Sequence, residues 1–312
     1  MVAVEAPAKV NLTLTVTGRR ADGYHWIESL MQTVDLVDRV VLVRTPSEAG
    51  VRCVGNGVPV GDGNLACRAV RALQEAVPPP AGEWEGVTIR IRKRIPVAGG
   101  LAGGSANAAA ALIGANALWG LGIGRKELAR IGAQVGADVP FCLYGGTAVA
   151  QGIGDVLEPV PPAPPLAGVI LNPGFPVSTA RVYQLYDEWR LPLGEEGRAR
   201  AMAEAVAAHD VRAVAQLLQN DLEAVTVRLH PEVAALRELV LSAGALGAVM
   251  CGSGPSVFGL AENPEHGEHL ARRLAGRVPF AVACRFVSHG ARITGFAQGP
   301  GGEGGTIVCA DR

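Results

Sequence analysis

A glycine-rich stretch from Pro96 to Asn107 constrains the fold of this chain more than any other segment. It reads PVAGGLAGGSAN, and it lies between alternating apolar residues at 87–91 and an alanine-rich stretch that ends at Leu118. The alternation predicts a strand and the alanine-rich stretch predicts a helix. Glycine lets the backbone turn tightly and come close to a ligand, and the free N–H groups at the start of a helix favour an anion. The stretch therefore predicts a phosphate-binding loop, and a flexible turn without a ligand is the alternative.

The spacing of the glycines excludes three common nucleotide loops. A Walker A loop ends in Gly-Lys-Ser/Thr, whereas here Gly104 is followed by Ser105 and Ala106. No register of the stretch places glycines at i, i+2 and i+5, as the dinucleotide fingerprint and the protein-kinase loop require. The His-Arg-Asp and Asp-Phe-Gly motifs of protein kinases are also absent from the sequence. A different class of nucleotide loop is therefore expected.

Length and charge describe a chain that can form two domains and is nearly neutral. Its 312 residues carry a formal net charge of −1, and no basic block indicates a nucleic-acid partner. The cysteines are Cys53, Cys67, Cys142, Cys251, Cys284 and Cys309. Because they form no C-x-x-C pair, zinc ribbons and a disulfide framework are not expected, and a reducing cytosol is favoured.

Two segments bear on the location of the protein. The first residues include Glu5, Pro7 and Lys9, where a secretory signal would have its apolar core. No charged residue occurs between Ile95 and Gly124, a span long enough to cross a bilayer, but Ala and Gly dominate it rather than Leu, Ile and Phe. We therefore expect a soluble, cytoplasmic protein without a membrane partner.

A proline-rich stretch at Pro159–Pro165 predicts the boundary between two domains. The first domain is expected over residues 1–160 and the second over 166–297. Residues 298–312 are rich in glycine and are expected to form a disordered tail.

The first half mixes strands and helices. Alternation over 10–16 predicts a half-buried strand with Lys9 and Asn11 on its polar face, and turn residues follow at 19–23. Further strands are expected over 27–36, 39–44, 87–91 and 147–151. Helices are expected from Leu65, along the alanine-rich stretch and from about Lys126.

In the second half the predicted elements alternate as in a ferredoxin-like domain. Strands are expected over 167–171, 247–251, 257–260 and 281–287. Helices are expected over 179–189, up to 218, over 231–243 and over 265–275. The turn Cys251–Ser256 is either a plain hairpin or a second set of backbone donors for phosphate.

Several side chains outside the glycine stretch are candidates for chemistry. Tyr24, His25 and Trp26 follow a turn and can stack or form hydrogen bonds. Asp138 lies among small and apolar neighbours in a loop, so it is either a helix cap or a carboxylate kept partly dry. Lys9 alone would be a solvated residue on a polar strand face.

Taken together, the strand with Lys9, the glycine stretch and the turn Cys251-Gly252-Ser253-Gly254 resemble the three signature motifs of the GHMP small-molecule kinases. This family phosphorylates alcohols such as galactose, homoserine and mevalonate. The resemblance extends to about Gln298. It implies an α+β fold of two domains: one like domain 2 of ribosomal protein S5 and a ferredoxin-like C-terminal domain.

Longer matches resemble one branch of this family. They are Ala8–Leu12, Gly18–His25, Gly99–Asn107, Gly136–Phe141 and Asn220–Glu223. The segment Asp22-Gly23-Tyr24-His25 is the most discriminating, and the glycine loop is one residue longer than is usual in the family. That branch uses ATP to phosphorylate a hydroxyl of cytidine diphosphate methylerythritol in the non-mevalonate isoprenoid pathway, and the resemblance implies the same small-molecule substrate here.

The resemblance also implies roles for individual residues. Asp138 would accept the proton of the substrate hydroxyl or orient it, and Lys9 would neutralise charge on the transferred phosphoryl group. Mg²⁺ would come with ATP, and no metal ligands are assigned. The substrate contacts would be Asn11, Tyr24, His25, Thr179 and Tyr183. The ATP-binding residues would be Pro96, Val97, Ala98, Gly99, Gly100, Leu101, Ala102, Gly103, Gly104, Ser105 and Ala106. Ala102 and Ala106 stand where the family often has Gly and Ser, so no side-chain role is assigned to Ala106.

Two other functions stay open from the sequence. Another kinase of the family, for homoserine or mevalonate, would share the glycine loop, but the segment Asp22–His25 argues against it. A non-catalytic nucleotide-binding module of the same fold should have lost Lys9 or Asp138, and both are present. The sequence assigns no oligomeric state.

Overall fold

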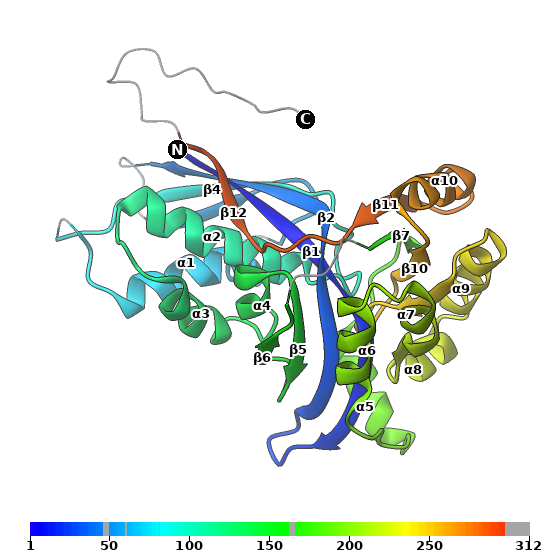
Figure 1. Ribbon diagram of the computed structural model, residues 1–312. Helices are drawn as coiled ribbons and strands as arrows, with labels where there is room; N and C mark the ends of the chain where they lie inside the picture. The colour runs from blue at the N-terminus through cyan, green and yellow to red at the C-terminus, as the bar shows by residue number, and fades with distance from the viewer. Residues whose placement is uncertain (46–49, 60, 81, 162–165, 297–312) are drawn as a thin grey trace.

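The fold begins with a long antiparallel strand pair. The computed structural model describes residues 1–45, 50–59, 61–80, 82–161 and 166–296. In it, β1 (Val2–Arg19) and β2 (His25–Arg44) pair over nearly their whole length, with three register shifts. Both strands run through the middle of the molecule (Figure 1).

The sequence predicted two strands where β2 is continuous. The polar residue between them, Asp38, is fully buried rather than at a break in the strand. Its carboxylate accepts hydrogen bonds from the backbone N–H groups of Arg94 and Ile95, at 2.7 and 2.9 Å. These tertiary bonds allow a carboxylate inside the ladder, so the strand does not end there.

Within the described ranges, eight strands form the first sheet. Besides β1 and β2 they are β3 (Val51–Val54), β4 (Val87–Arg92), β5 (Thr147–Gln151), β6 (Val156–Pro159), β8 (Gln219–Asn220) and β12 (Arg292–Phe296). Both β8 and β12 come from beyond the predicted domain boundary and pair with β1. A boundary at Pro159–Pro165 therefore stays a prediction; residues 162–165 and the predicted tail, 298–312, lie outside the described residues.

Four helices cover one side of β1 and β2 (Figure 1). They are α1 (Leu65–Ala76), α2 (Gly103–Trp119), α3 (Arg125–Ala133) and α4 (Val139–Tyr144). Of these, α2 packs against the sheet and against the other three helices, so it is apolar all round. This burial explains the uncharged stretch at 95–124. No helix in the described part of the chain has the length and apolarity needed to span a membrane.

The second half confirms the predicted ferredoxin-like order. The strands β7 (Ala167–Asn172), β9 (Gly247–Met250), β10 (Val257–Ala261) and β11 (Phe280–Arg285) form an antiparallel sheet in the order β11-β7-β10-β9. The helices are α5 (Thr179–Glu188), α6 (Arg198–Ala207), α7 (Val211–Leu217), α8 (Glu223–Leu229), α9 (Glu232–Ser242) and α10 (Pro264–Leu274). Helices α6–α10 lie on the opposite side of β1 and β2 from α1–α4 (Figure 1).

The sequence predicted two helices where the structure has α6 to α9. The chain leaves α6 through His209, whose φ is 53°, and the side chain of Asp210 then caps α7 by accepting from the N–H of Ala213. The prediction of a half-buried first strand is also wrong. Both faces are buried over Lys9–Val16, because helices pack on both sides of β1.

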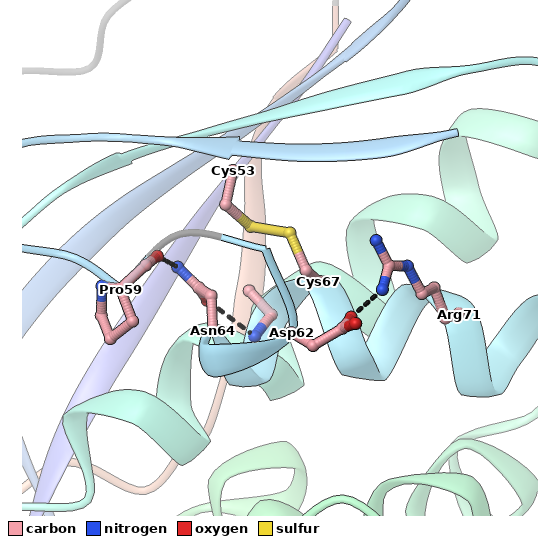
Figure 2. The surroundings of a disulfide bond; sticks show 7 residues. Cys53, Pro59, Asp62, Asn64, Cys67 and Arg71 are labelled. Carbon is pink, nitrogen blue, oxygen red and sulfur yellow. Dashed lines mark hydrogen bonds and ion pairs between the residues drawn. A yellow bond between two sulfur atoms is a disulfide. The ribbon is translucent and has the colours of Figure 1, made fainter. Parts of the chain in front are cut away.

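A disulfide joins Cys53 of β3 to Cys67 of α1 (Figure 2). The spacing of the cysteines had argued against disulfides. However, β3, which pairs in parallel with β4, packs against α1. Between the two cysteines, Asn64 accepts from the N–H of Ala66 and donates to the carbonyl of Pro59 (Figure 2). The turn before α1 is therefore held by its own cap as well as by the disulfide.

Loss of this disulfide should lower the free energy of unfolding by about 3 kcal/mol, because a crosslink across a loop of this length restricts the unfolded chain. Urea unfolding of Cys67→Ser measures the effect, and Cys284→Ser, at a buried free cysteine, controls for placing a hydroxyl in the core. A reductant should remove the extra stability of the wild type. The expectation fails if native protein without reductant alkylates at both Cys53 and Cys67.

Candidate active site

A cavity of about 920 Å³ lies among the glycine loop, the β1–β2 pair and α5. Most residues that the sequence singled out form its wall. They are Lys9, Asn11, Tyr24, His25, Pro96–Gly100, Ala102–Ser105, Asp138, Thr179 and Tyr183. The side chains of Leu101 and Ala106 instead lie in the hydrophobic cores. Any contact of these two residues with a ligand must therefore come from the backbone.

The glycine loop has the backbone conformation of an anion-binding nest. Ala98, Gly100 and Ala102, at every second position, have φ values of 49°, 78° and 53°. Left-handed residues that alternate with others turn successive N–H groups towards one concave side. The first turn of α2 follows directly, without a side-chain cap at its N-terminus. The loop therefore presents backbone donors and a positive dipole end to the cavity.

Two neighbouring segments hold the glycine loop in place. From β1, the N–H of Lys9 donates to the carbonyl of Leu101 at 3.2 Å. From the turn Cys251–Ser256, the N–H of Ser256 donates to the carbonyl of Gly99 at 3.2 Å. This turn is thus more than a hairpin, because it supports the loop and its Gly252 also lines the cavity.

Gly100→Ala should weaken ATP binding about tenfold or more, because its Cβ would meet the carbonyl oxygen of Cys251 at 1.9 Å and its φ is positive. Gly124→Ala is the control, since a Cβ there meets open space. Isothermal titration with ATP compares the two, and thermal unfolding checks that each is folded. Equal ATP affinity in a folded Gly100→Ala protein would contradict this account of the loop.

Lys9 and Asp138 meet in the wall of the cavity. The Nζ of Lys9 lies 3.7 Å from Oδ2 of Asp138, and the Lys9 side chain is 6% exposed against 30% for Asp138. Nζ also donates to Oδ1 of Asn11 at 2.7 Å, and Nδ2 of Asn11 donates to Ser29 at 2.8 Å. The ammonium is therefore fixed by two partners, while the carboxylate is open to the cavity.

The structure also bears on the two interpretations of Asp138. It stands at the N-cap position of α4, but its side chain makes no capping hydrogen bond. The side chain instead faces Lys9, so it does not act as the cap of α4.

Two cysteines near this pair remain neutral. Burial raises the pKa of Cys251 to about 12. Burial, with the nearby Asp138 charge as a smaller cause, raises the pKa of Cys142 well above its usual range. Neither thiol supplies a thiolate at neutral pH, so these cysteines are poor candidates for a nucleophile.

The cavity wall also carries aromatic residues. The rings of His25 and Tyr183 stack with centroids 4.7 Å apart and an interplanar angle of 24°. Tyr24 is 61% exposed at the cavity wall, so its ring is free for a ligand. The hydroxyl of Thr179 lies 2.7 Å from that of Ser253. Burial raises the pKa of Tyr183, with the Asp138 charge adding to it, so the phenol stays neutral.

Several residues of the wall were not predicted from the sequence. They include Val58, Pro59, Leu65, Lys93, Gln184 and Asp187. In the sequence, Lys93 is one of several basic residues around a strand, and Asp187 is one of several charged residues on a helix. Only the contacts of Lys93 with Asp38 and of Asp187 with His25 set them apart.

No group of three or more His, Cys, Asp or Glu side chains in the part of the chain that the structure describes could hold a metal ion.

Family models match both halves of the chain. The model of the GHMP kinases N terminal domain matches residues 64–146, and that of the GHMP kinases C terminal matches residues 202–279. The N-terminal match includes the glycine loop and Asp138. Together the two matches cover more than half of the chain.

Curated relatives match most of the length of this chain. A 4-diphosphocytidyl-2-C-methyl-D-erythritol kinase of Moorella thermoacetica is 45% identical over 91% of this chain and 99% of its own. One of Gloeobacter violaceus is 48% identical over 88% of this chain and 90% of its own. A crystal structure of a 4-(cytidine 5′-diphospho)-2C-methyl-D-erythritol kinase superposes with a TM-score of 0.75 at 36% identity, over 91% of this chain and 98% of its own.

Proposed function

The chain belongs to the GHMP kinases, in the branch of the 4-diphosphocytidyl-2-C-methyl-D-erythritol kinases, and from this premise we propose how its residues share the reaction. It phosphorylates a hydroxyl of its cytidine diphosphate-linked substrate, the ATP-dependent step of the non-mevalonate isoprenoid pathway. The observation that supports the assignment of residues is the pair Lys9–Asp138, 3.7 Å apart, in the same cavity as the glycine loop.

ATP binds with its phosphates in the glycine loop. The nest at Ala98–Ala102 and the start of α2 supply N–H donors there. Mg²⁺ enters as part of the Mg·ATP substrate. The hydroxyl of Ser105, in the cavity wall, is an oxygen group that would suit Mg²⁺.

The substrate hydroxyl lies against Asp138. Its oxygen forms a bond to the γ-phosphorus of ATP while the bond from that phosphorus to the ADP oxygen breaks. The hydroxyl proton passes to the Asp138 carboxylate, and the Lys9 ammonium offsets negative charge on the transferred group. Asn11 serves this step by orienting Lys9, because its amide oxygen accepts from Nζ.

Asp138→Asn should lower kcat by roughly 10²–10⁴ and leave ATP affinity nearly unchanged, since it removes a positioned proton acceptor. Lys9→Ala should lower kcat by a similar factor. The double variant should lose less kcat than the two single losses multiplied together, because the pair works as a unit. Steady-state kinetics measures the losses, with the exposed Glu127→Gln of α3 as the control. Near-native turnover by folded Asp138→Asn would show that another group takes the proton.

The cytosine base lies against the aromatic residues of the cavity wall. Tyr24 offers an exposed ring face for stacking, and His25, in a stack with Tyr183, offers a ring edge for hydrogen bonding. Thr179 contributes a hydroxyl from the start of α5.

His25→Ala should lower kcat/KM for the cytidine substrate more than about tenfold and narrow its advantage over the uridine analogue, because a polar partner of the base edge is lost. Tyr24→Ala should weaken both analogues about equally, by roughly 1–3 kcal/mol per lost stack. The measurement is kcat/KM for both analogues. An unchanged ratio in His25→Ala would assign base reading to another group.

An acceptor panel tests the function as a whole. Phosphoryl transfer from Mg·ATP is measured with the cytidine diphosphate substrate, with homoserine, with mevalonate and with no acceptor. Turnover should require the cytidine compound. Preference for homoserine or mevalonate would favour another kinase of the family, and ATP binding without turnover would favour a non-catalytic module. The cytoplasmic location stays a prediction.

A further inference from the structure

Asp187 contacts the base-reading histidine from a distant part of the chain. It lies in the last turn of α5, and its Oδ1 is 2.8 Å from Nε2 of His25 at the start of β2. Its Oδ2 lies 3.2 Å from Nε of Arg19 at the end of β1. The carboxylate is therefore held at both oxygens, and its orientation towards the imidazole is set.

This contact determines which ring nitrogen of His25 carries hydrogen. A carboxylate is an acceptor only, so the nitrogen that faces it, Nε2, carries a hydrogen. In the neutral ring Nδ1 then keeps its lone pair. Carboxylates orient imidazoles in the same way in catalytic and metal sites.

The remaining nitrogen, Nδ1, is the one that neither contact engages. One face of the imidazole is covered by the stacked ring of Tyr183, and the Nε2 edge is taken by Asp187. Among the described residues, Nδ1 has no hydrogen-bond partner, and His25 is part of the cavity wall.

A lone pair at this position distinguishes the two pyrimidines. Cytosine presents an N4 amino donor where uracil presents the O4 acceptor. We propose that Asp187 is a positioning residue that makes the site choose cytosine over uracil, by holding His25 in the Nε2–H tautomer. This inference rests on the proposed function, in which His25 reads the base.

A purely structural role for Asp187 makes a different prediction. In that case it would only join α5 to the β1–β2 turn, and an amide that accepts from the same Nε2–H would replace it without effect on base choice. Any loss of activity would then affect both pyrimidines equally.

Asp187→Asn separates these roles, because an amide can donate to Nε2 or accept from it and so no longer enforces one tautomer. The cytidine-to-uridine ratio of kcat/KM should fall about tenfold or more. The loss should appear as a higher KM for the cytidine substrate, with kcat nearly unchanged, since Asp187 contacts neither Lys9 nor Asp138 in the described structure. Glu188→Gln is the matched control: it is the next carboxylate of α5, pairs with Arg181 at the surface and should leave the ratio unchanged.

A second measurement reads the tautomer itself. In protein labelled with ¹⁵N at histidine, the signals of His25, assigned with His25→Gln, should show Nε2–H in the wild type. In Asp187→Asn they should show a mixture of tautomers.

The possible outcomes distinguish a failure of this inference from a failure of the proposed function. A wild type that does not phosphorylate the cytidine substrate contradicts the proposed function. A wild type that does, together with an Asp187→Asn variant that keeps its preference for cytidine, contradicts the role of Asp187 alone. An Nδ1–H signal in the wild type would overturn it as well.

Discussion

Several parts of the molecule depend on one buried ammonium group, that of Lys9. Lys9 is 5% exposed in the middle of β1, and a cation removed from water without partners costs several kcal/mol. Its partners come from two parts of the chain. Asn11 lies in the same strand, and Asp138 lies in the loop that α2 and α4 hold against the sheet. The backbone of Lys9 also binds the glycine loop through Leu101. One residue thus ties the glycine loop and the carboxylate to a single strand.

The second half is joined to this strand pair by another buried charge. Glu28 of β2 is 5% exposed, and its carboxylate accepts from the N–H groups of Gly197 and Ala199 at the start of α6. These N–H groups lie at a helix N-terminus, where negative charge is favourable. The cavity wall combines residues from both halves, so its shape depends on this junction and on the contact of Asp187 with His25.

Local patterns predicted the parts of the structure that depend on local interactions. The strand at Thr147–Gln151, the helix after the glycine loop and the helix that begins at Leu65 are as expected, because periodicity acts over a few residues. The continuous β2, the disulfide and the pairing of β8 and β12 with β1 depend on contacts between distant segments, which no short pattern encodes. For the same reason the loop residues were predicted to line the site whereas Asp187, an ordinary acidic residue on a helix, was not.

The pairing of β12 with β1 has a consequence for folding during synthesis. Val2–Phe296 is a register pair of the first sheet, so Val2 leaves the ribosome long before its neighbour in β12 is made. At about 5–20 residues per second, the wait is roughly 15 to 60 s. During translation this stretch of β1 has an open edge, and such an edge can pair with other chains. Pairing with β2 covers only the opposite edge of β1, so this edge stays open until synthesis reaches β12.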